Sequence, residues 1–209
     1  MWEGEGMTQE EKTNRTRERI LTAALEEFGT KGYSEATMGE ICSKHHIAKG
    51  LLYHNFASKE ALYLACVSRC FDAVMEYLQQ HSQGVELGGY MESRFRFFST
   101  HPRYARIFFE AVLQPPETLK EEIKVCKAPF DAYNRAVYRK ALAHMTLRQG
   151  VTEQDALEYY EIMQEMFNGY FSSSAYAGKD LGFLGSQHEN QLAKILDLML
   201  YGIVEQEMK

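Results

Sequence analysis

Proline is scarce in this chain, with four residues in 209, and no segment of useful length alternates between polar and apolar residues as a half-buried β-strand would. Residues that favour helices, such as Leu, Ala, Glu, Lys, Met and Gln, are abundant. The composition therefore predicts an all-α protein.

Long apolar runs are missing as well. The longest, residues 195–204, is interrupted by Asp197 and is much shorter than the roughly 18 residues that indicate a membrane span. Residues 1–6 carry two glutamates and lack the basic flank and apolar core of a signal peptide. We therefore expect a cytoplasmic protein without membrane association, whose translation starts at Met1 or at Met7.

Cysteine is too sparse and too widely spaced to indicate a disulfide framework or a zinc site. The four cysteines form no CxxC pair, and Cys66 and Cys70, four residues apart, have no histidine or further cysteine at zinc-site spacing. We expect reduced and mostly buried thiols, with no metal and no cofactor. A metal or redox site is the less favoured alternative.

Catalytic motifs are also absent. The sequence has no HExxH, no GxSxG, no GxxxxGK[ST] and no GxGxxG, and no histidine follows a glutamate by three residues as a di-iron bundle requires. These absences argue against an enzyme.

The charge is unevenly distributed. The net charge is −6, but between residues 12 and 59 eight Lys and Arg stand against five Asp and Glu, which leaves +3 there and −9 on the rest. Three of the seven histidines also lie in this segment. A basic end on an acidic body is expected when only one end approaches phosphate groups.

The first 80 residues carry the pattern of four helices separated by tight turns. Gly32 is a helix stop, Thr37 and Glu40 form a capping box, and Ser58 is a good N-cap. Two short helices joined by a tight turn, after one helix and before a long one, indicate a helix-turn-helix module with a connecting helix. The expected spans are 14–31, from Thr37 to about His45, 48–54 and 59–80.

We assign residues 1–57 to a three-helix N-terminal domain, in which residues 1–12 are a disordered leader. Residues 58–209 form a C-terminal helical bundle, and 58–80 is its connecting helix. Pro129 is expected to kink or break one helix of this bundle. The other expected helices are 90–100, 103–113, 118–148, 155–177 and 189–207, with 178–186 as a break.

The segment from Glu18 to Leu62 resembles the DNA-binding domain of the TetR family of transcription regulators. The matching pieces are Arg19-Ile20-Leu21, Ala23-Ala24, Phe28, Gly32-Tyr33, Thr37-Met38, Ile41-Cys42, Ile47 to Phe56 and Ser58 to Leu62; residues 101–106 resemble the start of a middle helix of that family. Beyond them the resemblance implies only a helical domain for effector binding and dimerisation. The chain departs from the family pattern at His45-His46 and at Ala48, which weakens the turn and the N-cap.

The second short helix suits contact with DNA if Leu52 and Phe56 face the core. Lys49 can reach a guanine edge or a phosphate, Gly50 lets the backbone approach, and Leu51 can pack on a thymine methyl. Alternatives are a half-buried Tyr53 and a merely solvated Lys59. Protonation of His45 and His46 could also add affinity at lower pH. The predicted contacts to a double-stranded operator are Thr37, Ala48, Lys49, Gly50, Leu51, Tyr53, His54 and Lys59.

The last two long helices are apolar on more than one face, so that one face can pack on its own subunit and the other on a partner. We therefore expect a homodimer, as a palindromic operator requires; the alternative is that both helices are core of a monomer. The predicted interface residues are Met163, Tyr170, Phe171, Leu192, Ile195, Leu196, Met199 and Ile203.

Aromatic residues are concentrated in the middle of the chain, and most are ordinary core. Some are expected to line a pocket for a small-molecule effector. Glu110 or Glu165 could pair with a cationic ligand, although a solvated glutamate is the commoner case. The predicted pocket residues are Met91, Phe95, Phe98, Phe109, Tyr133 and Phe167.

Taken together, the sequence predicts a dimeric, ligand-responsive DNA-binding regulator, most simply a repressor that an effector releases. Activation remains open because the same docking serves either outcome. The rival interpretation is a ligand-binding or protein-interaction module that has lost operator binding.

Overall fold

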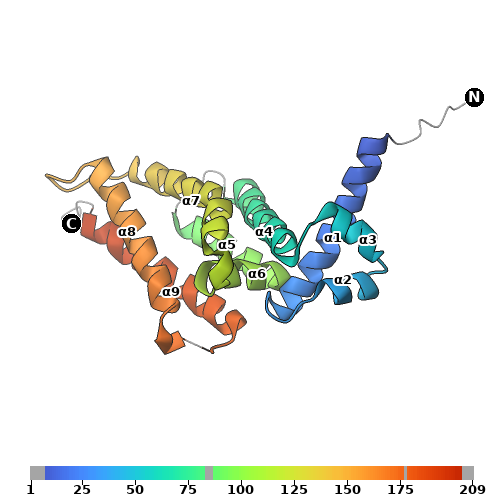
Figure 1. The fold of residues 1–209 in the computed structure, drawn as a ribbon. Coiled ribbons are helices and arrows are strands. Elements are labelled where there is room, and N and C mark those ends of the chain that lie inside the picture. Colours follow the sequence, from blue (N-terminus) through green and yellow to red (C-terminus); the bar gives the residue numbers. More distant parts are fainter. Residues whose placement is uncertain (1–7, 83–86, 177, 204–209) are drawn as a thin grey trace, which may run out of the picture.

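A computed structural model describes residues 8–82, 87–176 and 178–203, with side chains as far as residue 200. All regular elements of the described ranges are helices, so the all-α prediction is confirmed (Figure 1). They are α1 (Gln9–Lys31), α2 (Met38–Lys44), α3 (Lys49–Asn55), α4 (Lys59–His81), α5 (Leu87–Thr100), α6 (Pro102–Leu113), the 3-10 helix η1 (Glu117–Leu119), α7 (Lys120–Leu142), α8 (Glu153–Phe171), the 3-10 helix η2 (Ser174–Tyr176) and α9 (Leu181–Ile203).

Helices α1, α2 and α3 form a small module at one end of the molecule, and α4 leads from it into the larger bundle (Figure 1). The core of the module is apolar: Phe28, Ile41 and Leu52 are fully buried and Phe56 is nearly so. Their burial fixes which face of α3 points outward.

The bundle is built around α6, which packs against α1, α4, α5 and α9. Its core is rich in aromatic rings: Phe108 on α6 makes edge contacts with Phe71 of α4 and Phe130 of α7. Helix α6 therefore contacts both the small module, through α1, and the C-terminal helix α9.

Helix α1 begins five residues earlier than expected, and the expected disordered leader 1–12 is wrong for residues 8–12; residues 1–7 lie outside the described residues. The reason is local, because Thr8 and Glu11 form a complete capping box. The Thr8 hydroxyl accepts from the Glu11 N–H, and the Glu11 carboxylate accepts from the Thr8 N–H at 2.7 Å.

Helix α9 begins at Leu181, so the break expected at 178–186 is largely helix. The Asp180 carboxylate accepts from the Phe183 N–H at 3.0 Å, which satisfies one free donor of the first turn. A Cβ on Gly185 would lie 2.4 Å from the Phe109 ring of α6. The glycine therefore allows close packing of α9 on α6 rather than marking a loop.

Two more expectations need correction. Helix α7 continues from Lys120 to Leu142 through Pro129, so the expected break there is wrong, while the alternative of a kink stays a prediction. Helix α8 ends at Phe171 and not at Ala177. The predicted C-terminal end of the last helix, at 207, lies outside the described residues.

In the described part of the chain, no helix is long and apolar enough to cross a membrane. All four cysteines are free thiols; Cys42, Cys66 and Cys70 are buried and Cys126 is partly so. Burial raises the pKa of the Cys66 and Cys70 thiols, so that both stay protonated.

Candidate functional site

The outward face of α3 carries the side chains that the sequence predicts to contact DNA. Leu52 is fully buried, whereas Leu51 is 37% and Tyr53 52% exposed. Lys49, Gly50 and His54 are exposed as well, and a Cβ on Gly50 would meet nothing within 4 Å. The predicted DNA residues Thr37 and Ala48 are also at the surface, and Lys59 is half-buried. The helix thus presents a row of polar groups beside an open backbone.

The turn before α3 is held by arginines of α1, which sequence reasoning did not single out. His46 adopts a φ of 51°, in the left-handed region that most side chains avoid. Its carbonyl accepts from Arg19 at 2.9 Å. At the other end of α3, Arg17 donates to the carbonyl of Asn55 at 3.1 Å and lies 4.2 Å above the Phe56 ring. Both contacts fix α3 against α1.

A buried carboxylate further ties this turn to α1. Glu27 is fully buried and pairs with Lys44 of α2 and, at 3.5 Å, with Lys31. Burial opposes ionisation of Glu27, but the hydrogen bond and charge of Lys44 outweigh it and lower the pKa. His45 Nε2 lies 3.5 Å from Glu27 Oε1. Glu27 lies beside Ala23 and Phe28, and a charged residue inside an apolar helix face needs a partner. The sequence therefore carried a signal for a buried ion pair at this position.

The N-cap predicted for Thr37 of α2 is confirmed, but the reciprocal half of the predicted capping box is replaced by a bond between the two side chains. The Thr37 hydroxyl accepts from the Glu40 N–H at 3.2 Å and donates to the Glu40 carboxylate at 3.0 Å. The same carboxylate binds Lys31 at 2.7 Å, and these contacts lower the pKa of Glu40. The ammonium of Lys59 lies 4.5 Å from the centre of the Tyr33 ring, so this lysine is not merely solvated.

The module is fastened to α6 by Glu110, which does not point into a ligand cavity. Its carboxylate accepts from the Tyr33 N–H at 3.0 Å and from the Tyr63 hydroxyl at 2.9 Å. Burial raises the pKa of Glu110, and these donors oppose the rise. Position 32 favours glycine, because its φ is 82° and a Cβ there would lie 2.9 Å from the Glu110 carboxylate. The loop that leads into α2 is therefore clamped onto α6.

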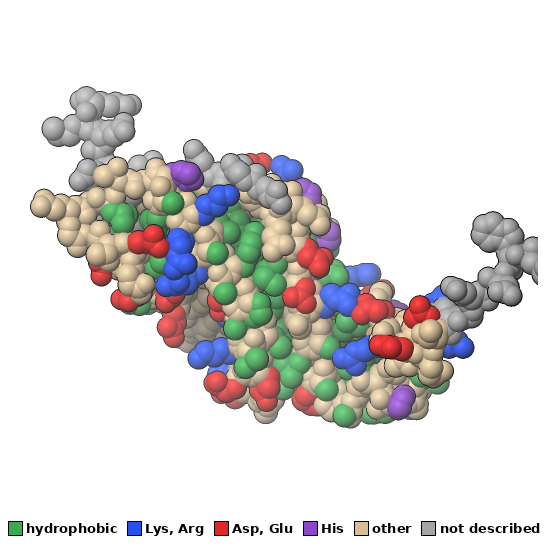
Figure 2. Space-filling view, turned by 90° about the horizontal axis from the view of Figure 1, so that it is seen from above, with side chains coloured by type: hydrophobic (Ala, Val, Ile, Leu, Met, Phe, Trp, Pro, Cys, Tyr) green, Lys and Arg blue, Asp and Glu red, His purple; other side chains and the backbone are tan. Residues whose placement is uncertain are grey.

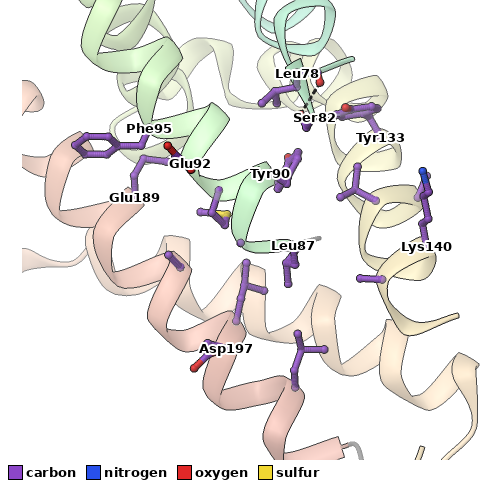
Figure 3. A pocket seen from close by; sticks show the side chains of 18 of the residues that line it. Leu78, Ser82, Leu87, Tyr90, Glu92, Phe95, Tyr133, Lys140, Glu189 and Asp197 are labelled. Atoms are coloured by element: carbon purple, nitrogen blue, oxygen red, sulfur yellow. Dashed lines mark hydrogen bonds between the residues drawn. The ribbon is translucent and has the colours of Figure 1, made fainter. Parts of the chain in front are cut away.

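A cavity of about 1020 Å³ lies between α4, α5, α7 and α9. Figure 3 shows Leu87 and Tyr90 of α5 between Tyr133 and Lys140 on one wall and Asp197 on the opposite one. Its lining is largely apolar, so it suits a small organic ligand. Of the predicted pocket residues, Met91, Phe95 and Tyr133 line the cavity. The other three, Phe98, Phe109 and Phe167, do not line it and are buried in the core. Their rings pack instead against residues of α6 and α9. Glu165 is exposed.

A buried ion pair lies beside this cavity. Glu189 of α9 lines it and accepts two hydrogen bonds from Arg94 of α5, at 2.8 and 2.6 Å. Burial opposes ionisation of Glu189, but the charge and hydrogen bonds of Arg94 lower its pKa to about 2. Arg94 lies 5.4–6.0 Å from four aromatic ring centres, and its own pKa is raised. Tyr90, next to the pair, donates to Asn134 of α7.

The two last long helices leave apolar residues at the surface, and of these only Tyr170 and Ile195 belong to the interface that the sequence predicted. On α8, every third or fourth residue is apolar and about half or more exposed: Tyr159, Ile162, Met166 and Tyr170. On α9, Phe183, Ile195 and Leu198 are exposed. Figure 2 views the molecule from above. On this face too, hydrophobic side chains reach the surface of the bundle, in a band across its middle.

Five of the eight predicted interface residues are buried within the protomer, and two are exposed. Because both faces of α8 and α9 are apolar, sequence spacing could not tell the inner face from the outer one. Tyr170 and Ile195 are the exposed two, and the side chain of Ile203 lies outside the described residues. The buried five are Met163, Phe171, Leu192, Leu196 and Met199.

The helix-turn-helix matches a known family. The family model described as "Bacterial regulatory proteins, tetR family" matches residues 20–66, which cover α2, α3 and the parts of α1 and α4 that pack on them. Residues 20–66 therefore form a DNA-binding domain of the TetR family. This family is not enzymatic, in agreement with the missing catalytic motifs.

Two curated relatives are similar to part of this chain. The biofilm operon icaADBC HTH-type negative transcriptional regulator IcaR of Staphylococcus epidermidis is 29% identical over 110 residues, which are 52% of this chain and 59% of IcaR. The HTH-type transcriptional regulator UidR of Escherichia coli K12 is 38% identical over 76 residues, 36% of this chain and 39% of UidR. The matches therefore span about half the length of these relatives.

The fold likeness extends further. A TetR-family transcriptional regulator from Pectobacterium atrosepticum superposes with a TM-score of 0.66 at 18% identity, covering 96% of this chain and 99% of that one. At this identity the likeness concerns the fold alone, and it extends over nearly the whole chain.

Proposed function

We propose that this TetR-family chain is a cytoplasmic transcription regulator that binds a palindromic operator as a homodimer and is released by a small molecule. The observation that carries the proposal is the exposed polar face of α3, fixed from behind by Leu52 and Phe56 and at both ends by arginines of α1. Repression is the favoured direction because a relative, IcaR, is named a negative regulator.

The proposed docking places α3 along the major groove, where Lys49 reaches a guanine edge or a phosphate. Gly50 allows close approach because its outward side is open. Tyr53 and His54 are proposed to bind phosphate oxygens beside the groove, and Thr37 does the same from the N-terminus of α2. Lys59 contributes less, because its ammonium already lies on Tyr33.

Lys49→Ala is expected to weaken binding to the duplex that the wild type selects from a random library, and to relax base preference. The slope of the logarithm of affinity against the logarithm of salt concentration should fall by about one. Fluorescence anisotropy at several salt concentrations measures both. Lys124→Ala, which removes an exposed charge from α7, is the control and should leave binding unchanged. Equal affinity of the wild type and Lys49→Ala would contradict this docking face.

The exposed stripe on α8 supports the proposed homodimer. Tyr159, Ile162, Met166 and Tyr170 are each more than half exposed and follow one another at helical spacing. An apolar stripe of this kind is unfavourable in water and is typical of an interface. A two-fold dimer places two α3 helices on half-sites one helical turn apart, at about 34–36 Å.

Met166→Glu is expected to shift the protein from dimer to monomer, because it places a charge in the middle of the proposed apolar interface. Sedimentation velocity or light scattering coupled to gel filtration gives the mass. Val125→Glu is a matched control, since Val125 is 73% and Met166 71% exposed, but on different helices. A dimer that Met166→Glu leaves intact would place the interface elsewhere.

The cavity between α4, α5, α7 and α9 supports the proposed effector site. Its volume suits a small organic molecule. The helices that line it contact α6 or α4, and both α6 and α4 contact α1 of the DNA-binding module. A thermal-shift screen is the test, because a ligand that binds the folded state raises the unfolding temperature. A hit that raises this temperature but leaves operator affinity unchanged would contradict the release mechanism.

A further inference from the structure

The turn between α2 and α3 lacks two local features that commonly stabilise such a turn. Among the described residues, His46 is the only one other than glycine with a positive φ, and a β-carbon is crowded in that conformation. Ala48, the N-cap of α3, makes no side-chain hydrogen bond to the first turn of that helix. The local chemistry of the turn therefore holds the start of α3 only weakly.

A long-range contact from α1 acts on the strained residue itself. Arg19 donates to the carbonyl of His46 at 2.9 Å, although the two residues are 27 positions apart. The N–H of the same peptide group belongs to Ile47 and donates to the carbonyl of Cys42 on α2 at 2.9 Å. One peptide group is thus held from both sides, by α1 and by α2. Its orientation follows from the left-handed conformation of His46, so the bond from Arg19 stabilises that conformation.

The other end of α3 offers a matched contact without strain. Arg17 donates to the carbonyl of Asn55 at 3.1 Å. Asn55 belongs to the regular part of the helix, and Phe56 after it is extended, with a φ of −138°. Arg17 therefore contacts α3 from the same helix as Arg19 does, but it holds no residue in an unfavourable conformation.

We propose that Arg19 is a positioning residue for the DNA-reading helix, because it holds the left-handed turn at His46 from which α3 starts. The inference rests on the proposed DNA-binding function. Without Arg19, position 46 relaxes toward negative φ, and only the molecules that keep the turn present α3 in register. The apparent affinity falls with that fraction, and a dimer loses it in both subunits. Base contacts need exact placement of α3, whereas phosphate contacts carry no sequence information, so base preference falls as well.

The test compares Arg19→Gln with the wild type by fluorescence anisotropy on two probes. One is the duplex that the wild type selects from a random library, and the other is a shuffled duplex of the same length. We expect the affinity for the selected duplex to fall about tenfold, since one hydrogen bond is lost in each of two subunits. The ratio of the two affinities should fall too. The salt slope should stay unchanged, because no phosphate contact is lost.

Two further variants separate positioning from other effects. Glycine adopts a positive φ without strain, so Arg19→Gln should lower the affinity much less when it is combined with His46→Gly. Arg17→Gln, which removes the same group from the same helix, is the matched control, and His46→Gly should leave its effect unchanged. In the absence of DNA, the Ile47 amide hydrogen should exchange faster in Arg19→Gln than in the wild type, as measured by NMR.

The outcomes distinguish this inference from the function on which it rests. A salt slope that falls by about one would make Arg19 a phosphate contact, which overturns the inference and leaves the proposed function standing. An equal loss with and without His46→Gly, or an unchanged affinity of Arg19→Gln, does the same. Because Arg19 is exposed, its variant should unfold at nearly the wild-type temperature, and a large drop would count against the inference. A wild type that binds neither duplex overturns both.

Discussion

Arg94→Met is expected to lower the free energy of unfolding by about 3–5 kcal/mol, because it leaves the Glu189 carboxylate buried without its cationic partner. Both residues are 3% exposed, and the two hydrogen bonds between them are the main contact of this carboxylate. Urea denaturation at neutral pH measures the loss. An Arg94→Met protein as stable as the wild type would show that the pair does not form.

The double variant Arg94→Met/Glu189→Met separates the pair from simple packing. Replacing both partners by apolar residues of similar volume is expected to recover most of the loss, since a buried ion pair contributes little net stability compared with well-packed apolar residues. A double variant that is as unstable as Arg94→Met alone would assign the loss to packing around the methionine at position 94.

The same pair predicts how stability depends on pH. The pKa of Glu189 is lowered in the folded state to about 2, from the ordinary value of 4.5 for a glutamate. A carboxyl group with a lowered folded-state pKa stabilises the protein above its unfolded pKa, and this contribution is lost as the pH falls toward the folded pKa. The wild type should therefore lose more stability between pH 4.5 and pH 2 than the double variant does.

Gly29→Ala is expected to have the second largest effect, a loss of about 1–3 kcal/mol from overpacking. A Cβ at this position would lie 2.6–2.9 Å from the backbone and Cβ of Arg103, so α1 and α6 would have to separate. Because this contact and Glu110 set how the DNA-binding module sits on the bundle, operator affinity should fall as well. Thermal unfolding and anisotropy measure the two effects.

Gly169→Ala is the control for that variant. Gly169 lies within α8, and a Cβ there would meet nothing within 4 Å. Alanine in an open helical position is expected to stabilise by about 0.5–1 kcal/mol, the opposite sign from Gly29→Ala. If the two variants had the same stability, the close approach of α1 and α6 would not be the reason for glycine at position 29.

The N-terminal module could be predicted closely because its signals are local. Thr37 and Ser58 stand where α2 and α4 begin, and the spacing of Leu52 and Phe56 already determined the outward face of α3. An N-cap hydrogen bond spans three residues and the faces of a helix repeat every turn, so both are readable from a short stretch of sequence. The capping box of Thr8 and Glu11 was equally readable and was missed.

Other features depended on elements far apart in the chain. Arg94 and Glu189 are 95 residues apart, and Tyr33 is 77 residues from Glu110. The local sequence around one member of each pair therefore does not identify the other member. The cavity is likewise lined by residues of four helices, from Leu78 on α4 to Leu200 on α9.

The sequence by itself determined the all-α class, the helix-turn-helix and the residues that α3 turns outward, because these follow from interactions within one or two helical turns. Only the tertiary structure decided which apolar face of α8 and α9 is internal, where the cavity lies and which buried charges are paired. A helix with two apolar faces can bury either one, and the choice is made by neighbouring helices that are distant in sequence.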